Sequence, residues 1–156
     1  IGVEAEGEMR VGVVHIPVLD ETYAAVKGSG ATLNGEPISV SSTDELSSSL
    51  LSTGFPYDED LMPRAQEIFS NLLRKSRGIR RDGAAGVDLV YLASGRFDGF
   101  WELGLSPWDV AAGSLIIEEA GGCVTDLSGG DHDIYESQGI VATNGDFHKE
   151  LLRKLS

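Results

Sequence analysis

Two hydrophobic patterns follow one another along this sequence, and their order restricts the fold more than any other feature. In the first 40 residues, apolar and polar residues alternate in short runs, and turn signals such as Asn34-Gly35 separate the runs. This pattern is typical of an antiparallel β-meander. We expect its strands at residues 1–6, 9–15, 22–26, 31–33 and 38–40.

In the second pattern, which follows the meander, segments of helical periodicity alternate with short apolar runs. Helices are expected at residues 58–76, 83–94, 108–120 and 146–154. Strands are expected at residues 50–53, 78–81, 97–102, 123–127 and 139–143. The sequence therefore predicts a layered α/β fold, in which an antiparallel β-meander is followed by an alternating α/β unit.

The change of pattern falls between residues 41 and 57. We therefore expect residues 1–57 to be part of a central antiparallel β-sheet region, and residues 58–156 to form a C-terminal α/β subdomain. The chain opens inside a strand-like pattern at Ile1 and has no initiator Met. The first region is accordingly interpreted as N-terminally truncated.

The formal net charge of −13 makes a nucleic-acid partner improbable, because phosphate backbones repel an acidic surface. The same charge suits divalent cations, although a plain acidic surface explains it as well. No apolar run approaches the roughly 20 residues that a membrane helix needs, so no membrane association is expected. The single cysteine, Cys123, cannot form an internal disulfide, which favours a reducing, cytoplasmic location.

The glycine-rich run Lys27-Gly28-Ser29-Gly30 is a candidate phosphate-binding loop. It lacks the Gly-Lys-Ser/Thr ending of such loops, and no helical pattern follows it. The run is therefore expected to be a turn between two strands.

Small residues gather at the expected start of the second helix, in the run Gly83-Ala84-Ala85-Gly86. Small side chains at a strand-to-helix junction let a ligand approach the backbone, and the free amides of a helix start favour anionic or hydroxylated groups. Close packing of the helix on a sheet would require the same residues. The pattern alone favours neither explanation.

Two acidic residues flank the start of the third helix. Asp109 is expected in its first turn, where it can cap the helix or bind a hard cation such as Mg²⁺. Glu102 ends the preceding strand, and ligands of α/β sheets bind where strand ends face helix starts. Glu102 and Asp109 are therefore candidates for one shared pocket.

These segments resemble the inositol monophosphatase family. The resemblance rests on Gly95-Arg96-Phe97-Asp98-Gly99-Phe100-Trp101-Glu102, on Trp108-Asp109-Val110-Ala111-Ala112-Gly113 and on Glu119-Ala120-Gly121-Gly122, which are similar to the C-terminal signature of the family. The runs Val11-Gly12-Val13-Val14 and Ala25-Val26-Lys27-Gly28-Ser29-Gly30-Ala31 with Asn34-Gly35 are similar to its central hairpins. The likeness covers nearly the whole chain.

The resemblance implies a layered fold of the sugar-phosphatase type, a homodimer and a Mg²⁺ cofactor. It implies hydrolysis of a small phosphomonoester, most simply inositol monophosphate, by metal-activated water. Asp109 matches a metal ligand, and Glu102 matches a residue that contacts the hydroxyls of a phosphorylated polyol or sugar. Gly83 and Ala85 match residues that line the substrate site through their backbone, and no catalytic residue of this chain is assigned.

The sequence also departs from the family pattern. The upstream Glu-containing loop and the Asp-Pro-x-Asp-Gly-Thr motif, which carry the other metal ligands, are not in these 156 residues. Position 84 is Ala where many members have Ser or Thr, and Gly86 replaces a more common Ala. Two alternatives therefore stay open: a fructose-1,6-bisphosphatase-like or nucleotide-bisphosphate phosphatase, and a fragment that binds a partner or ligand without catalysis.

Overall fold

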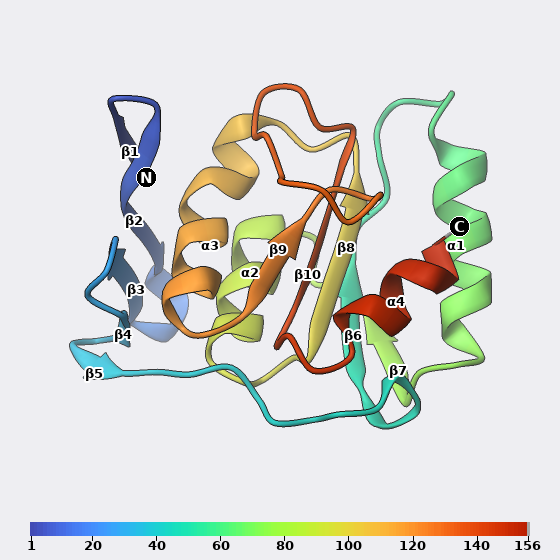
Figure 1. Cartoon of the computed structure of the whole chain (residues 1–156), viewed down its shortest axis with the longest axis horizontal. Helices are drawn as coiled ribbons and strands as arrows, with labels where there is room; N and C mark the ends of the chain where they lie inside the picture. Colours follow the sequence, from blue (N-terminus) through green and yellow to red (C-terminus); the bar gives the residue numbers. More distant parts are fainter. Residues whose placement is uncertain (156) are drawn as a thin grey trace.

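Sheets and helices alternate in four layers in the computed structural model, which describes residues 1–155 (Figure 1). The first sheet contains β1 (Gly2–Ala5), β2 (Glu8–Ile16), β3 (Glu21–Val26), β4 (Ala31–Leu33) and β5 (Glu36–Pro37). The second sheet contains β6 (Leu50–Thr53), β7 (Gly78–Arg80), β8 (Gly99–Leu103), β9 (Cys123–Thr125) and β10 (Gly139–Thr143). Helices α2 (Ala85–Ala93) and α3 (Pro107–Glu119) lie between the sheets, and α1 (Met62–Leu73) and α4 (His148–Leu155) cover the outer face of the second sheet. The predicted layered α/β fold is thereby confirmed.

The first sheet is an antiparallel meander in chain order, β1-β2-β3-β4-β5, as the alternating pattern predicts. The strand expected at residues 38–40 is wrong, because the last strand is β5 at Glu36–Pro37. Beyond β5 the chain leaves the sheet: the amide of Val40 donates a 3.1 Å hydrogen bond to the carbonyl of Ala120 at the end of α3. Ile38 and Val40 still pack against the core, so their apolar character reflects burial in a connection.

The second sheet is mixed and has the strand order β7-β6-β8-β10-β9. Strand β6 pairs parallel with both β7 and β8, whereas β10 pairs antiparallel with β8 and β9. The chain therefore enters the second sheet at Leu50. The division into regions 1–57 and 58–156 stays a prediction.

Helix α1 begins at Met62, four residues later than the helical pattern predicts. The preceding acidic residues form a turn instead, in which the amide of Asp60 donates a 2.9 Å hydrogen bond to Oδ1 of Asp58. A local side-chain acceptor of this kind competes with helix formation. The pattern thus identified the helix and misplaced its start.

Helix α3 is the centre of the molecule, because it contacts the first sheet, α2 and β9. Its side chains are apolar on nearly every side, and those from Ala112 to Ile117 are all buried. Glycines permit the close contacts on two of these sides. A Cβ atom on Gly12 of β2 would lie 2.6 Å from the carbonyl oxygen of Ala112, and one on Gly113 would lie 2.6 Å from Cδ1 of Leu89 in α2.

The C-terminal end of α3 is tied to the first sheet by Glu119. Its carboxylate accepts hydrogen bonds of 2.7 and 2.8 Å from the amides of Gly28 and Gly30, and these bonds lower the pKa of Glu119. The run Lys27–Gly30 is thus the turn between β3 and β4, as predicted. Its amides do bind an anionic group, but that group is a carboxylate of the same chain.

No helix among the described residues is long and apolar enough to cross a membrane.

The close contact at Gly12 leads to a stability prediction. Gly12→Ala should lower the free energy of unfolding by about 1–3 kcal/mol, because the added methyl group collides with the backbone of α3. Gly86→Ala is the matched control, since nothing lies within 4 Å of a Cβ atom at that position. It should leave stability unchanged or raise it by up to about 1 kcal/mol. Thermal denaturation measures both variants, and equal effects would contradict the packing explanation.

Candidate functional site

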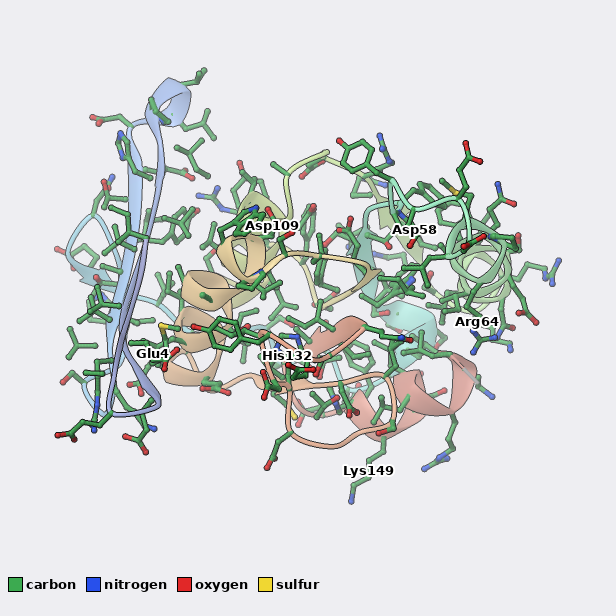
Figure 2. All side chains as sticks on the ribbon, turned by 90° about the horizontal axis from the view of Figure 1, so that it is seen from above. Glu4, Asp58, Arg64, Asp109, His132 and Lys149 are labelled. Carbon is green, nitrogen blue, oxygen red and sulfur yellow. The ribbon has the colours of Figure 1, made fainter. Side chains whose placement is uncertain are left out.

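A pocket of about 160 Å³ opens where the ends of β6 and β8 face the starts of α2 and α3. All four residues that the sequence singled out, Gly83, Ala85, Glu102 and Asp109, line this pocket. Figure 2 shows Asp109 and Asp58 toward the same edge of the molecule, with Lys149 toward the opposite edge. The fold therefore brings together residues that are separated by up to 26 positions in the chain.

Asp109 occupies the first turn of α3, as predicted. Its Oδ2 accepts a 2.9 Å hydrogen bond from the amide of Ser106, the residue before the helix. Pro107 follows Ser106 and begins the helix, a position where the missing amide of proline costs nothing. The capping role of Asp109 is thereby observed, and its second carboxylate oxygen leaves room for the metal-ligand role, which stays a prediction.

Glu102 lies in the central strand β8 and is only 8% exposed. Burial raises its pKa to about 7, and the charge of Asp109 acts in the same direction. The guanidinium of Arg81 and the amide of Gly54 lower the pKa and so offset part of this effect. A half-protonated carboxyl near neutral pH can both donate and accept hydrogen bonds, which suits the recognition of hydroxyl groups.

Gly54 is the residue that makes room for the Glu102 carboxylate. A Cβ atom at position 54 would lie 2.1 Å from Oε1 of Glu102. The sequence shows Gly54 only as the end of a strand before Phe55-Pro56-Tyr57, so its role in the site could not be predicted from the pattern.

The start of α2 supplies the backbone wall of the pocket. Gly83 has a φ of +85°, a left-handed conformation that favours glycine. Nothing lies within 4 Å of a Cβ atom built on Gly83 or on Gly86. Close packing on the sheet therefore does not explain these two glycines. The first amides of α2 lack intrahelical acceptors and face a region that a ligand can approach.

Two further charged residues of the pocket were missed at the sequence level, Arg81 and Asp88. The guanidinium of Arg81 lies 5.7 Å from the centre of the Phe55 ring. Asp88 is 1% exposed, and its Oδ1 has no hydrogen-bond partner among the described residues. The sequence does contain a signal for Asp88, because an acidic residue inside the apolar run from Val87 to Ala93 is unusual and indicates a special role.

Asp88 adds a third carboxyl group to the pocket, beside the predicted Glu102 and Asp109. Burial is the main cause that raises the pKa of Asp88 to about 7; the charges of Asp82 and Glu102 act in the same direction, whereas Ser52 and Arg81 act against it. Three carboxyl groups, those of Asp88, Glu102 and Asp109, thus line the pocket with a single guanidinium. An arrangement of this kind attracts a cation.

The donor set fits part of a Mg²⁺ site. Mg²⁺ prefers carboxylate oxygens and usually keeps several waters, binding through one or two carboxylates together with substrate phosphates. Asp109 offers one such carboxylate at the open side of the pocket. Within residues 1–155, however, no three His, Cys, Asp or Glu side chains are gathered closely enough to hold a metal ion by themselves.

The pKa of Asp88 leads to a prediction about pH. An unfolded chain has an Asp pKa near 3.9, so a folded pKa of about 7 means that the folded state binds more protons between these values. Stability contributed by the protonated form is present below pH 4 and is lost as the pH rises through 7. Asp88→Asn should therefore raise the free energy of unfolding at pH 8 by roughly 2–4 kcal/mol, and by much less at pH 5.

Thermal denaturation at the two pH values, without divalent cations, measures this difference. Asp44→Asn is the matched control, because Asp44 is exposed and the change in charge is the same. A gain at pH 8 that persists unchanged at pH 5 would show that Asp88 is not protonated in the folded state.

Comparisons with known proteins identify the family of this chain. The model of the inositol monophosphatase family matches residues 1–156. The chain is 44% identical over 155 residues to Nus factor SuhB of Pseudomonas aeruginosa, covering 97% of this chain and 57% of that protein. It is 43% identical over 157 residues to inositol-1-monophosphatase of Synechocystis sp., covering all of this chain and 54% of that protein.

A solved structure of inositol monophosphatase from Anabaena (Nostoc) sp. superposes with a TM-score of 0.90 at 44% identity, covering 99% of this chain and 61% of that one. Extragenic suppressor protein suhB from Bartonella henselae superposes with a TM-score of 0.93 at 40% identity, covering 98% and 58%. The chain thus spans little more than half the length of these relatives. Over that length, sequence and structure agree, and the chain belongs to the inositol monophosphatase family.

Proposed function

We propose that this chain is the C-terminal part of a Mg²⁺-dependent phosphatase that hydrolyses a small phosphomonoester, with inositol monophosphate as the leading substrate. The observation that carries the proposal is the convergence of Glu102, Asp109 and the start of α2 on one pocket. These are a carboxyl suited to hydroxyl groups, a carboxylate suited to a hard cation, and helix amides suited to an anion. A phosphorylated polyol presents hydroxyls and an anion together.

Each residue has a separate role in this proposal. Asp109 holds the cation through the carboxylate oxygen that does not cap α3. Glu102 accepts hydrogen bonds from substrate hydroxyls and so orients the ring, while the backbone at Gly83 and Ala85 lies against it. When bound, Mg²⁺ would supply Lewis-acid stabilisation of the charge on the phosphoryl group. The remaining ligands would come from parts of the whole protein that these 156 residues do not include, since the chain covers 57% of one relative and 54% of another.

A related candidate is a fructose-1,6-bisphosphatase-like or nucleotide-bisphosphate phosphatase. Arg81 at the pocket provides a cation for a second phosphate. A substrate panel on the full-length protein separates these possibilities, and a strong preference for a bisphosphate would end the inositol proposal.

A second function, from a different class, is binding without catalysis. Its support is the donor set, which does not gather three metal-binding side chains within the described residues. Relatives that are 44% and 45% identical also carry the names Nus factor SuhB and putative Nus factor SuhB, which are not names of phosphatases. We place this second to the phosphatase because the pocket combines carboxyl groups with an open helix start.

For the whole protein we propose a cytoplasmic homodimer that acts on a small phosphorylated polyol or sugar and has no nucleic-acid partner. The single cysteine supports the location, and the net charge of −13 supports the lack of a nucleic-acid partner. The homodimer and the substrate class are what membership of the family implies.

The metal role of Asp109 is tested by Asp109→Asn in the full-length protein. An asparagine oxygen still accepts the hydrogen bond from Ser106, so the helix cap is kept while the charge is lost. Mg²⁺-dependent phosphate release from inositol 1-phosphate should fall by at least about 100-fold. Asp126→Asn is the control, because Asp126 also caps backbone amides but lies outside the pocket. Equal activity of the two variants would refute the role.

The role of Glu102 is tested with two substrates. Glu102→Gln should reduce kcat/KM for inositol 1-phosphate by about 10-fold or more, mainly through KM, because a neutral amide accepts hydrogen bonds more weakly than a carboxylate and one of the two acceptor oxygens becomes an NH2 donor. Hydrolysis of p-nitrophenyl phosphate, which has no ring hydroxyls, should change little. Similar losses on both substrates would show that Glu102 acts on the reaction itself and not on hydroxyl recognition.

A further inference from the structure

The positive charges of this acidic chain are concentrated in two segments, which contain the outer helices α1 and α4 and the residues that follow α1. Residues 62–80, from α1 to β7, and residues 148–155, which form α4, contain eight Lys and Arg and only two Glu, a net charge of +6. The remaining residues contain four Lys and Arg and 23 Asp and Glu, a net charge of −19. A division of charge this strong is not expected from composition alone. We call the outer surface formed by α1, residues 74–77 and α4 the basic face.

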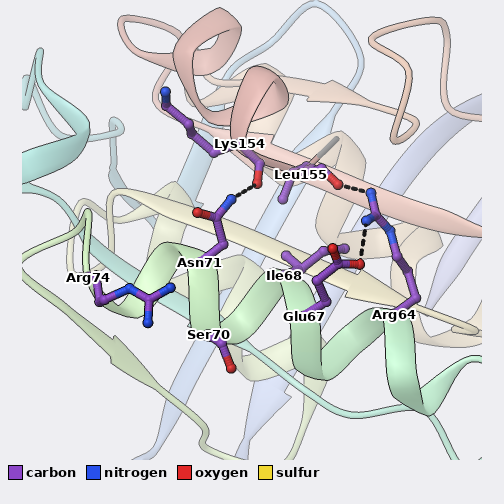
Figure 3. A pocket seen from close by; sticks show the side chains of 8 residues that line it. All are labelled: Arg64, Glu67, Ile68, Ser70, Asn71, Arg74, Lys154 and Leu155. Carbon is purple, nitrogen blue, oxygen red and sulfur yellow. Dashed lines mark hydrogen bonds and ion pairs between the residues drawn. The ribbon is translucent and has the colours of Figure 1, made fainter.

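A groove of about 380 Å³ runs between α1 and α4 on this face (Figure 3). Its framework is made by side chains of α1 that bind the end of α4. Asn71 donates a 2.6 Å hydrogen bond to the carbonyl of Lys154, and the guanidinium of Arg64 donates to the carbonyl of Leu155 and pairs with Glu67 at 2.9 Å. These contacts satisfy carbonyls that a helix end leaves free, and they fix the width of the groove.

The cations at the rim of the groove are not used in this framework. Figure 3 shows the side chains of Arg74 and Lys154 on opposite sides of the groove with no bond to its other lining residues. Neither side chain has an ion-pair partner in the part of the chain that the structure describes. Arg77, Lys149 and Arg153 on the same face are likewise exposed and without an ion pair there.

Helix electrostatics explain only part of this arrangement. Cations in the last turn offset the helix dipole, and Arg153 and Lys154 occupy that position in α4. One or two cations serve that purpose, and Arg77 and Lys149 lie outside any last turn. Arg74, at the C-cap of α1, and Lys154 also lie near helix ends, but this position leaves their side-chain donors without an ion-pair partner among the described residues. These two cations, like Arg77 and Lys149, are therefore available to an anionic partner.

The surroundings of the basic face restrict the kind of partner. A nucleic acid would extend past the face onto surface that carries most of the −19 charge, and its phosphates would be repelled there. A short peptide with closely spaced carboxylates fits within the groove and avoids that surface. Opposite charges at such an interface also accelerate association.

We propose that the groove between α1 and α4 is a docking site for an acidic peptide segment of another protein. Arg74 and Lys154 pair with its carboxylates, and the framework of Arg64 and Asn71 keeps these two cations apart. The site is independent of the phosphatase pocket, whose lining shares no residue with it.

The experiment measures fluorescence anisotropy of a labelled oligoglutamate peptide with the full-length protein. Binding should weaken strongly when the ionic strength rises from about 0.1 M to about 1 M, which shortens the Debye length from about 10 Å to about 3 Å. Arg74→Glu combined with Lys154→Glu should weaken binding by at least about 10-fold. Arg10→Glu combined with Lys27→Glu makes the same change in charge on the first sheet and should have a much smaller effect.

Three results would overturn the proposal: no peptide binding by the unaltered protein, equal losses in the two double variants, or tighter binding of a single-stranded RNA of the same charge. The last result would indicate a nucleic-acid surface instead. If the Glu variants unfold, Arg74→Gln with Lys154→Gln replaces them. This pair removes both positive charges without adding negative ones, and undiminished peptide binding by it would equally refute the site.

Discussion

The close approach of helix α3 to its neighbours is the constraint on which the rest of the structure depends. Gly12 lets β2 contact the backbone at Ala112, and Gly113 lets α3 contact Leu89 of α2. Gly113 lies four residues after Asp109, which corresponds to about 6 Å along a helix. A helix that is fixed at this point from two sides also fixes the direction of the Asp109 carboxylate. The packing of the core therefore also determines the geometry of the pocket.

The pocket differs from the closely packed core, because its buried carboxyl groups lower the stability of the folded protein. Asp88 and Glu102 are buried with pKa values near 7, and the charge of Asp109 adds to the repulsion at Glu102. Arg81 relieves part of this repulsion and does not remove it. A core that packs this closely around α3 can tolerate such a group of carboxyls. Natural proteins retain unfavourable groups of this kind mainly where function requires them.

The sequence could predict what depends on local pattern and could not predict what depends on neighbours in space. Period-two alternation and the Asn34-Gly35 turn identified the meander, and the position of Asp109 before an apolar helix placed it in the first turn. The strand at 38–40 failed because apolar residues in a buried connection look the same as those in a strand. Gly54 and Asp88 were missed because their roles arise from the approach of β6 and α2 to β8, which no local pattern records.

The basic face and the pocket share no lining residue, but α1 joins them physically. Phe69 of α1 packs against Phe55 at a ring distance of 5.6 Å, and Phe55 in turn lies under the guanidinium of Arg81. Phe55 and Arg81 both line the pocket. A bound peptide would contact the side of α1 that carries Asn71 and Arg74, whereas Phe69 packs against the core cluster that contains Leu51 and Trp101 of the second sheet. Such a partner can therefore alter the pocket only if it moves α1 as a body, and the bonds from Arg64 and Asn71 to the end of α4 oppose that movement.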